Sequence, residues 1–352
     1  MVTSPVRPDS YATVPMQWVG PISVVHPELT GLVEVPLATY ESPLWPSVDR
    51  GARVTKAGGG LHLAVVDERM TRSVVVEAYS AQEAIAARDF VLAHQEDLAA
   101  VTRTTSRFAR LKDIHSQIAG NLLYLRFAFD TGDASGHNMA TKAADALLHW
   151  LLERRPELAY VSISGNLCCD KKPSAVNGLL GRGKYVVAEM RLSRDLCRRF
   201  LKTTPEKIAD LNLKKNLIGT LLAGGLRAAN AHFANMLLGF YLATGQDAAN
   251  IVEGSQGLVH AEVRNDELYF SVTLPNLIVG TAGNGKDLPF VRENLQRMGC
   301  LEDRAPGANA RRLALLAAAT VWCGELSLLA AQTNPGELMK AHEKLERAKT
   351  PT

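Results

Sequence analysis

The stretch SGNLCCDKKP, residues 164–173, marks the point where the chain changes from alternating strands and helices to a helix-rich sequence. It places the carboxylate of Asp170 next to Lys171 and Lys172, between a Gly-Asn pair and a proline. Because those flanking residues favour turns, the segment is predicted to be a loop. A loop that fixes a lysine beside a carboxylate can hold a substrate carboxylate or stabilise an oxyanion. A surface turn with solvated charges explains the same residues equally well.

The region before this loop has the periodicities of a compact α+β unit. Strand-like alternation and amphipathic helical spacing follow one another along it. The predicted strands are residues 74–78, 124–129 and 158–163, and the predicted helices are residues 81–98 and 137–154. Two units of β-α-β type within residues 73–163 predict a small independent domain.

The rest of the chain is predicted to form a larger, helix-rich domain. Residues 205–211 and 314–329 have helical periodicity, whereas residues 268–274 alternate like a strand. Residues 217–244 are apolar nearly all round, which predicts a long, buried central helix. Short strand-like runs broken by prolines occupy residues 16–46. The sequence therefore predicts an α+β fold in which the small domain is inserted into the large one.

Composition and charge argue against several classes of protein. The formal net charge of +3 over 352 residues is too small to indicate nucleic-acid binding. Residues 1–14 read as a loose tail without the apolar core of a secretory signal, and no uncharged apolar run reaches the ~20 residues of a membrane span. Five cysteines without disulfide or zinc spacing indicate reduced thiols. We therefore expect a cytoplasmic protein with no metal, no membrane segment and no nucleic-acid partner.

Several motifs along the chain resemble the 3-hydroxy-3-methylglutaryl-coenzyme A reductase family. The segment SGNLCCDKKPSAVNGLLGRGK, residues 164–184, is similar to the substrate loop of that family. Further matches occur in the family's order, and they are TSRFARL (105–111), GDASGHNM (132–139), KNL (215–217), NAHFAN (230–235), GQD (245–247) and GELSL (324–328). The resemblance covers nearly the whole chain and is closer to the eukaryote-like class of the family.

The resemblance implies that the chain reduces (S)-3-hydroxy-3-methylglutaryl-coenzyme A in two hydride steps to mevalonate and free coenzyme A. Lys171 matches the catalytic lysine, which would stabilise the oxyanion in both steps. Glu41 matches the catalytic glutamate, which would be protonated or share a proton with Lys171, and which needs a raised pKa to act as an acid. Asp247 matches the aspartate that supports this coupling. His342 matches the histidine that protonates the departing thiolate.

The resemblance also assigns binding positions, each of which, taken singly, is equally typical of a turn or a solvated surface. The substrate carboxylate is assigned to Arg72, Ser164, Asn166, Lys172, Lys215 and Asn235. The phosphates of coenzyme A are assigned to Arg50 and Lys202. The cofactor is assigned to Ser106, Arg107, Asp133, Ser135, Gly136, His137, Asn138, Gly283 and Gly285. Because an Arg beside a hydroxyl favours a 2′-phosphate over a bare ribose, NADPH is favoured over NADH.

The resemblance further implies how the chain is divided and assembled. Residues 73–163 would be a ferredoxin-like nucleotide domain inserted into a substrate domain made of residues 15–72 and 164–334. Residues 335–352 would form a flap that carries the catalytic histidine. Since active sites of the family form between subunits, the chain is expected to be a homodimer or a higher homo-oligomer.

The chain also departs from the family's usual pattern. His137 stands where the family usually has Met, and Asn284 and Lys286 interrupt the second glycine-rich loop. The acidic dimerisation motif is not recognisable near residues 9–16. These departures leave open a catalytically weak paralogue that acts as a binding partner. Oxidation of mevalonate and use of a related acyl-coenzyme A are further alternatives.

Overall fold

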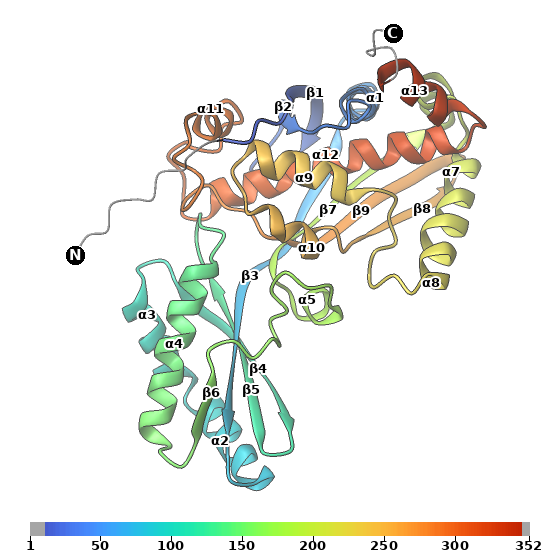
Figure 1. The fold of residues 1–352 in the computed structure, drawn as a ribbon. Coiled ribbons are helices and arrows are strands. Elements are labelled where there is room, and N and C mark those ends of the chain that lie inside the picture. The colour runs from blue at the N-terminus through green and yellow to red at the C-terminus, as the bar shows by residue number, and fades with distance from the viewer. Residues whose placement is uncertain (1–10, 347–352) are drawn as a thin grey trace.

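The computed structural model describes residues 11–346, and one long strand organises it (Figure 1). Strand β3 (Leu61–Glu77) runs from the larger upper part of the molecule into the smaller lower part. Its first half pairs with β7 (Gly183–Ser193), and its second half, from Met70 onward, pairs with β5 (Leu122–Asp130). A single strand therefore connects the two parts through continuous backbone hydrogen bonding.

The upper part is built on the strand order β2-β1-β3-β7-β9-β8. The remaining strands of this path are β1 (Met16–Val25), β2 (Gly31–Ala38), β8 (Leu258–Arg264) and β9 (Glu267–Leu277). The longer helices of this part are α1 (Leu44–Ala57), α7 (Pro205–Leu211), α9 (Phe233–Ala243), α11 (Pro289–Arg297), α12 (Ala308–Gln332) and α13 (Glu337–Glu346). Shorter turns of helix are α5 (Ala175–Leu180), α6 (Arg194–Leu196), α8 (Thr220–Leu222), α10 (Ile251–Gly254), η1 (Cys197–Leu201), η2 (Asn212–Gly219) and η3 (Ala248–Asn250).

The lower part packs three helices against a sheet that the far half of β3 forms with three further strands. Its elements are α2 (Ala81–Ala93), α3 (Gln95–Thr105), α4 (His137–Arg154), β4 (Arg110–Ala119), β5 and β6 (Ala159–Ser162). Its apolar core is separate from that of the upper part and draws on residues 70–158, with Ile278 as the one buried contributor from elsewhere. The helices predicted at 137–154 and 205–211 have the predicted bounds. The helix predicted at 81–98 is instead divided at His94 into α2 and α3.

The prediction of a long, buried helix over residues 217–244 is wrong. Helix α9 begins only at Phe233, and Gly224 and Arg227 adopt left-handed backbone conformations in the turn before it. Leu221 and Leu222 are 79% and 83% exposed, so the first part of this apolar run faces outward. The apolar run is therefore divided between an exposed segment at its start and the buried helix α9 at its end.

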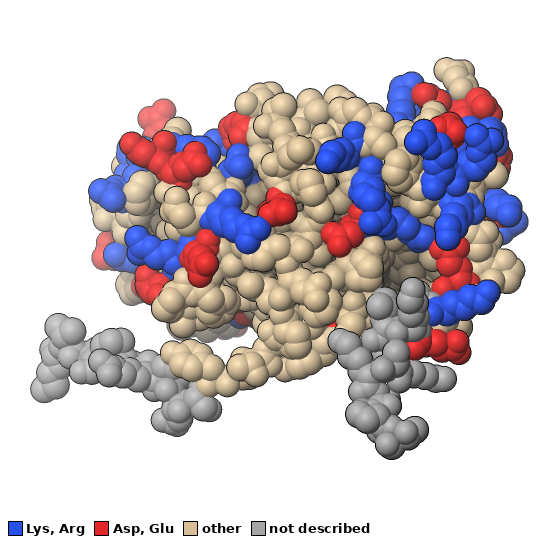
Figure 2. Space-filling view, turned by 90° about the horizontal axis from the view of Figure 1, so that it is seen from above, with Lys and Arg blue, Asp and Glu red and all other residues tan. Residues whose placement is uncertain are grey.

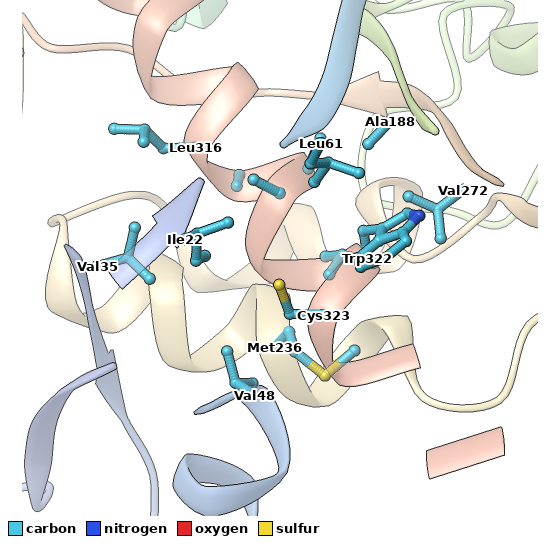
Figure 3. Packing of buried hydrophobic residues seen from close by; sticks show 14 of the residues in the cluster. Ile22, Val35, Val48, Leu61, Ala188, Met236, Val272, Leu316, Trp322 and Cys323 are labelled. Atoms are coloured by element: carbon cyan, nitrogen blue, oxygen red, sulfur yellow. The ribbon is translucent and has the colours of Figure 1, made fainter. Parts of the chain in front are cut away.

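The long central helix of the upper part is α12, which packs against α1, α9 and β7. It is long and apolar enough to cross a membrane by composition, but 94% of its most apolar window is buried inside the protein. Figure 3 shows Trp322 and Cys323 of this helix among buried side chains from the sheet, α1 and α9. The indole N–H of Trp322 donates to the Phe270 carbonyl at 3.1 Å, so its one polar atom is satisfied within the core.

The contact between α1 and α12 requires a glycine. A Cβ on Gly51 would lie 2.3 Å from the carbonyl oxygen of Cys323, which is backbone and cannot move aside. We expect Gly51→Ala to destabilise the protein by about 2–3 kcal/mol through overpacking. The matched control is Gly219→Ala, because a Cβ there meets only the Lys214 carbonyl at 3.6 Å. Thermal unfolding should separate the two variants, and an equal midpoint for both would contradict this account.

Candidate active site

The loop of residues 164–173 brings its first lysine into contact with Asp247. The Lys171 Nζ atom lies 2.6 Å from Asp247 Oδ2. The hydrogen bond to Asp247 raises the pKa of Lys171. Burial alone would raise the pKa of Asp247, but the hydrogen bond and charge of Lys171 outweigh it and the pKa is lowered. Both shifts favour the charged forms, so the pair is an ammonium and a carboxylate at neutral pH.

A buried arginine holds this loop in its conformation. Arg182, whose side chain is 2% exposed, lies 2.6 Å from the Asp170 carboxylate and 3.5 Å from the fully buried Glu253. Glu253 in turn accepts the backbone N–H of Lys171 at 2.9 Å. Lys171 has a φ of 56°, which is unfavourable for a residue with a side chain and needs such support. Sequence reasoning included Arg182 in a matched motif but gave no role to it or to Glu253.

The substrate-binding residues predicted near this loop lie around the same end of the sheet. Arg72 on β3 donates to the Ile163 carbonyl at 3.2 Å, directly before Ser164. Asn166 has a φ of 58° and its carbonyl accepts the N–H of Cys169, which closes the first turn of the loop. Lys172 donates to the Asp170 carbonyl at 3.2 Å, and its side chain is exposed. These contacts tie Arg72 to the residue before the loop and place Asn166 and Lys172 within the loop that carries Lys171.

Glu41 belongs to a second cluster at the other end of α9. The Asn235 amide donates to Glu41 Oε2 at 2.7 Å, and both residues line a pocket together with His232 and Arg50. His232 is held by Glu325, a fully buried carboxylate that accepts the backbone N–H groups of residues 231 and 232. Glu325 was missed as a functional residue, although it lies within one of the matched motifs.

Lys215 lies near this second cluster. Its ammonium donates to Asn216 at 3.1 Å. Burial lowers the pKa of Lys215, and the charge of Glu325 partly opposes this effect.

The two residues assigned to coenzyme A lie close to α13. Arg50 is engaged by Glu337 of α13 at 2.7 Å and by the Ser327 hydroxyl at 3.0 Å. The Asn334 amide donates both to Glu337 and to the Lys202 carbonyl. His342 is placed on α13 by its backbone, but its side chain is outside the described part of the structure. Seen from above, Lys and Arg gather on the side of the molecule where α1, α7 and α13 lie (Figure 2).

One chain does not bring Glu41 and Lys171 together. Asn235 lies in the first turn of α9 and Asp247 follows its last turn, and an 11-residue helix is about 16 Å long. Within residues 11–346, no hydrogen bond or ion pair joins Glu41 to the Lys171–Asp247 pair. The predicted catalytic residues therefore form two half-sites, with Lys171 and Asp247 in one and Glu41 in the other.

The two predicted nucleotide loops are packed against each other. Ala134 and Ala282 form a β-bridge, and a Cβ on Gly280 would lie only 2.3 Å from the Ser135 nitrogen. Gly136, with a φ of 97°, precedes the first residue of α4, and no side chain caps that helix end. Free N–H groups at a helix start, reached through a turn of small residues, can bind a pyrophosphate. This arrangement fits a dinucleotide.

The other residues predicted for the cofactor site lie in different environments. The Asp133 carboxylate accepts the N–H groups of Gly307 and Ala310, so it caps the start of α12. Ser106 ends α3, and the exposed Arg107 lies over the Phe108 ring. The left-handed Gly283 and Gly285 lie in the second loop, and the carbonyl of Gly285 lies close to Gly245. Asn138 is exposed beside the turn.

Lys286 turns toward the catalytic residues. Its ammonium donates to the carbonyl of Gly245, two residues before Asp247. Burial lowers the pKa of Lys286 to about 8. Within residues 11–346, no group of three or more His, Cys, Asp or Glu is arranged to hold a metal ion.

The charge on Asp170 makes stability depend on pH. The close approach of the His137 ring, 3.6 Å away, and the pairing with Arg182 hold the pKa of Asp170 well below its usual range, despite burial. A depressed pKa stabilises the fold above the unfolded value of about 4, and that stabilisation is lost as pH falls below it. We expect Asp170→Asn to cost about 2 kcal/mol at neutral pH, and the difference from wild type to shrink near pH 3. Thermal unfolding at both pH values measures this.

The control for this prediction is Asp145→Asn. That carboxylate on α4 is half exposed and forms only a long contact with His149. Its substitution should leave the unfolding midpoint nearly unchanged at both pH values. A difference for Asp170→Asn that is equally large near pH 3 and at neutral pH would contradict the assigned ion pair.

Comparisons with known proteins indicate one family over nearly the whole chain. A profile of the family described as hydroxymethylglutaryl-coenzyme A reductase matches residues 10–347. The chain is 42% identical over 343 residues to a 3-hydroxy-3-methylglutaryl-coenzyme A reductase of Aeropyrum pernix, covering 97% of this chain and 81% of that protein. It is also 42% identical to 3-hydroxy-3-methylglutaryl-coenzyme A reductase 1 of Oryza sativa subsp. japonica, covering 97% of this chain and 64% of that one.

A solved structure shows the same fold. It is the class II 3-hydroxy-3-methylglutaryl-CoA reductase from Streptococcus pneumoniae bound to NADPH in open conformations, with a TM-score of 0.72 and 21% identity. The match covers 92% of this chain and 86% of that one. The mixed α+β architecture expected from the sequence is therefore confirmed.

Proposed function

Since the chain belongs to the hydroxymethylglutaryl-coenzyme A reductase family, we propose that Lys171, Asp247, Glu41 and His342 carry out the NADPH-dependent reduction of (S)-3-hydroxy-3-methylglutaryl-coenzyme A to mevalonate. The observation that carries this assignment is the ion pair between Lys171 and Asp247 on a strained, well-supported loop. Strain of this kind concentrates at functional sites.

Lys171 acts on the reacting oxygen. NADPH supplies one hydride in each of two steps, first to the thioester carbonyl and then to the aldehyde. In both steps negative charge develops on the carbonyl oxygen, and a fixed ammonium stabilises it. Asp247 orients that ammonium and keeps it charged.

Glu41 and His342 handle the protons. Glu41 gives a proton to the oxyanion, and the Asn235 amide orients its carboxyl group. After the first hydride transfer the thiohemiacetal collapses to the aldehyde, and coenzyme A leaves as a thiolate. His342 on α13 protonates that thiolate, a role that suits the pKa of an imidazole. Arg50 and Lys202, which lie close to α13, bind the coenzyme A phosphates.

The cofactor binds to the lower part of the molecule. We assign residues 73–163 to a ferredoxin-like nucleotide domain, supported by its separate apolar core. The backbone N–H groups of the turn at Ser135, Gly136, His137 and Asn138 and of the second loop at Gly283 and Gly285 would hold the pyrophosphate. Ser106 and Arg107 receive the 2′-phosphate, because an exposed guanidinium beside a hydroxyl is suited to a phosphate group.

A second copy of the chain completes the site. Each chain holds the two half-sites at opposite ends of α9, so a partner can place its Glu41 cluster against the Lys171–Asp247 pair. An exposed apolar face is available for this contact, and it comprises Leu213, Leu217, Ile218, Leu221 and Leu222. Faces of this kind mark sites of association. We therefore propose a homodimer in the cytoplasm, where the five unpaired cysteines stay reduced.

The activity is tested by NADPH oxidation with hydroxymethylglutaryl-coenzyme A. Lys171→Ala should lower kcat at least about 100-fold, because a preorganised group on the oxyanion is lost. Lys56→Ala, at the exposed end of α1, is the control and should keep wild-type turnover. Substrate-independent oxidation by the wild type, or equal rates for both variants, would overturn the proposed reaction.

The shared site is tested by mixing two inactive variants. Lys171→Ala and Glu41→Gln each inactivate one half-site, and co-expression with two different affinity tags allows mixed dimers to form. We expect the mixture to recover about a quarter of wild-type kcat, since half of the dimers are mixed and each has one intact site. Recovery should reach about half in mixed dimers purified by both tags. No recovery in doubly purified dimers would show that each site forms within one chain.

A further inference from the structure

His137 lies between the nucleotide turn and the catalytic loop. It is the first residue of α4, and its Nε2 atom lies 3.6 Å from Asp170 Oδ1. That nitrogen is buried and has no hydrogen-bond partner. Its other ring nitrogen faces the Ser135 hydroxyl at 3.5 Å. Leaving a buried polar atom without a hydrogen bond costs free energy. The Nε2 atom of His137 lies just beyond hydrogen-bonding distance of a carboxylate, and this arrangement calls for a functional explanation.

A restraint on the position of Asp170 also restrains Lys171, the next residue in the chain. The Asp170 carboxylate pairs with Arg182 at 2.6 Å, and Arg182 also approaches Glu253, which accepts the Lys171 N–H. Arg182 is itself anchored, since it donates to the Thr71 carbonyl at 2.6 Å. Movement of Asp170 would therefore disturb the strained backbone of the next residue.

We propose that His137 is a positioning residue that couples the nucleotide turn to the catalytic loop, by donating from Nε2–H to Asp170 when the turn is occupied. This inference rests on the proposed function, because it takes the turn at Ser135 and Gly136 to be the NADPH site. When the Ser135 hydroxyl donates a hydrogen bond to Nδ1, the single proton of the neutral imidazole lies on Nε2. A movement of a few tenths of an ångström then makes a normal hydrogen bond.

Charge on the imidazole is not needed for this role. The groups that face His137 are Asp170 and Asp247, whose carboxylates are already paired with Arg182 and Lys171. A neutral N–H donor therefore suffices, and a glutamine amide can replace it.

The proposal is tested with His137→Met, His137→Ala and His137→Gln. Met and Ala remove the donor, and kcat should fall about 10-fold, as expected for losing one hydrogen bond to a charged group. Gln restores a donor and should stay within about 3-fold of wild type. The KM for NADPH should rise together with this loss of kcat in the Met and Ala variants, because a hydrogen bond that forms only when the turn is occupied also contributes to cofactor binding. His149→Met, an exposed histidine on the same helix, is the matched control and should behave as wild type.

Three results would overturn the proposal. They are wild-type kcat in the Met and Ala variants, a Gln variant as slow as Ala, and a loss confined to the KM for NADPH, which would make His137 a cofactor contact instead. Failure of the proposed function is distinguishable, because the wild type itself would then show no substrate-dependent NADPH oxidation.

A second measurement needs no turnover. Thermal unfolding of His137→Met, Asp170→Asn and the double variant, with and without NADPH, forms a double-mutant cycle. We expect the double variant to lose less in its midpoint than the sum of the single losses, and this coupling to grow with NADPH. Strictly additive losses under both conditions would show that the two side chains do not act together and would overturn the proposal.

Discussion

The pairing of Arg182 with two carboxylates is the interaction on which the catalytic loop depends. A guanidinium that is 2% exposed would be very unfavourable alone, and Asp170 and Glu253 supply the compensating charges. The two carboxylates come from distant segments, one from the loop before Arg182 and one from α10. The same carboxylate that neutralises Arg182 also accepts the backbone N–H of Lys171. The contacts that allow Arg182 to be buried therefore also fix the backbone orientation of Lys171.

The architecture brings this cluster to the junction of the two parts of the molecule. Strand β3 belongs to both, and Arg72 and Thr71 lie where its partner changes from β7 to β5. The loop of residues 164–173 returns the chain from the lower part to the upper part at the same place. The paired nucleotide loops meet there as well, through the bridge between Ala134 and Ala282. Under the proposed roles, a cofactor held by the lower part would meet residues supported by the upper part.

Apolar periodicity in the sequence predicted individual helices and strands well, whereas features that depend on tertiary contacts could not be predicted from it. Helix 137–154 was predictable because its apolar spacing matches one buried face, and its start follows a turn of small residues. The run at 217–244 failed as one helix because all-round apolar composition does not reveal where a helix is interrupted, here at Gly224 and Arg227. The role of Asp133 could not be predicted either, since its carboxylate caps α12, which begins far along the chain. Motif resemblance identified Lys171, Asp247 and Glu41 but could not show that a single chain separates them into two half-sites.

The separation of Glu41 from the Lys171–Asp247 pair has a chemical consequence. The hydrogen bond to Asp247 raises the pKa of Lys171, so its ammonium is a poor proton donor and a good electrostatic stabiliser. Under the proposed roles, the proton for the oxyanion must come from another acid. Asp247 cannot provide it, because its pKa is lowered and it stays ionised. Glu41 is the acid assigned to this step, and its carboxyl group accepts from the Asn235 amide, while Arg50 of the same pocket is paired with Glu337. Stabilisation and proton donation are thus divided between the two half-sites, and only their assembly in a dimer would place both functions on one carbonyl oxygen.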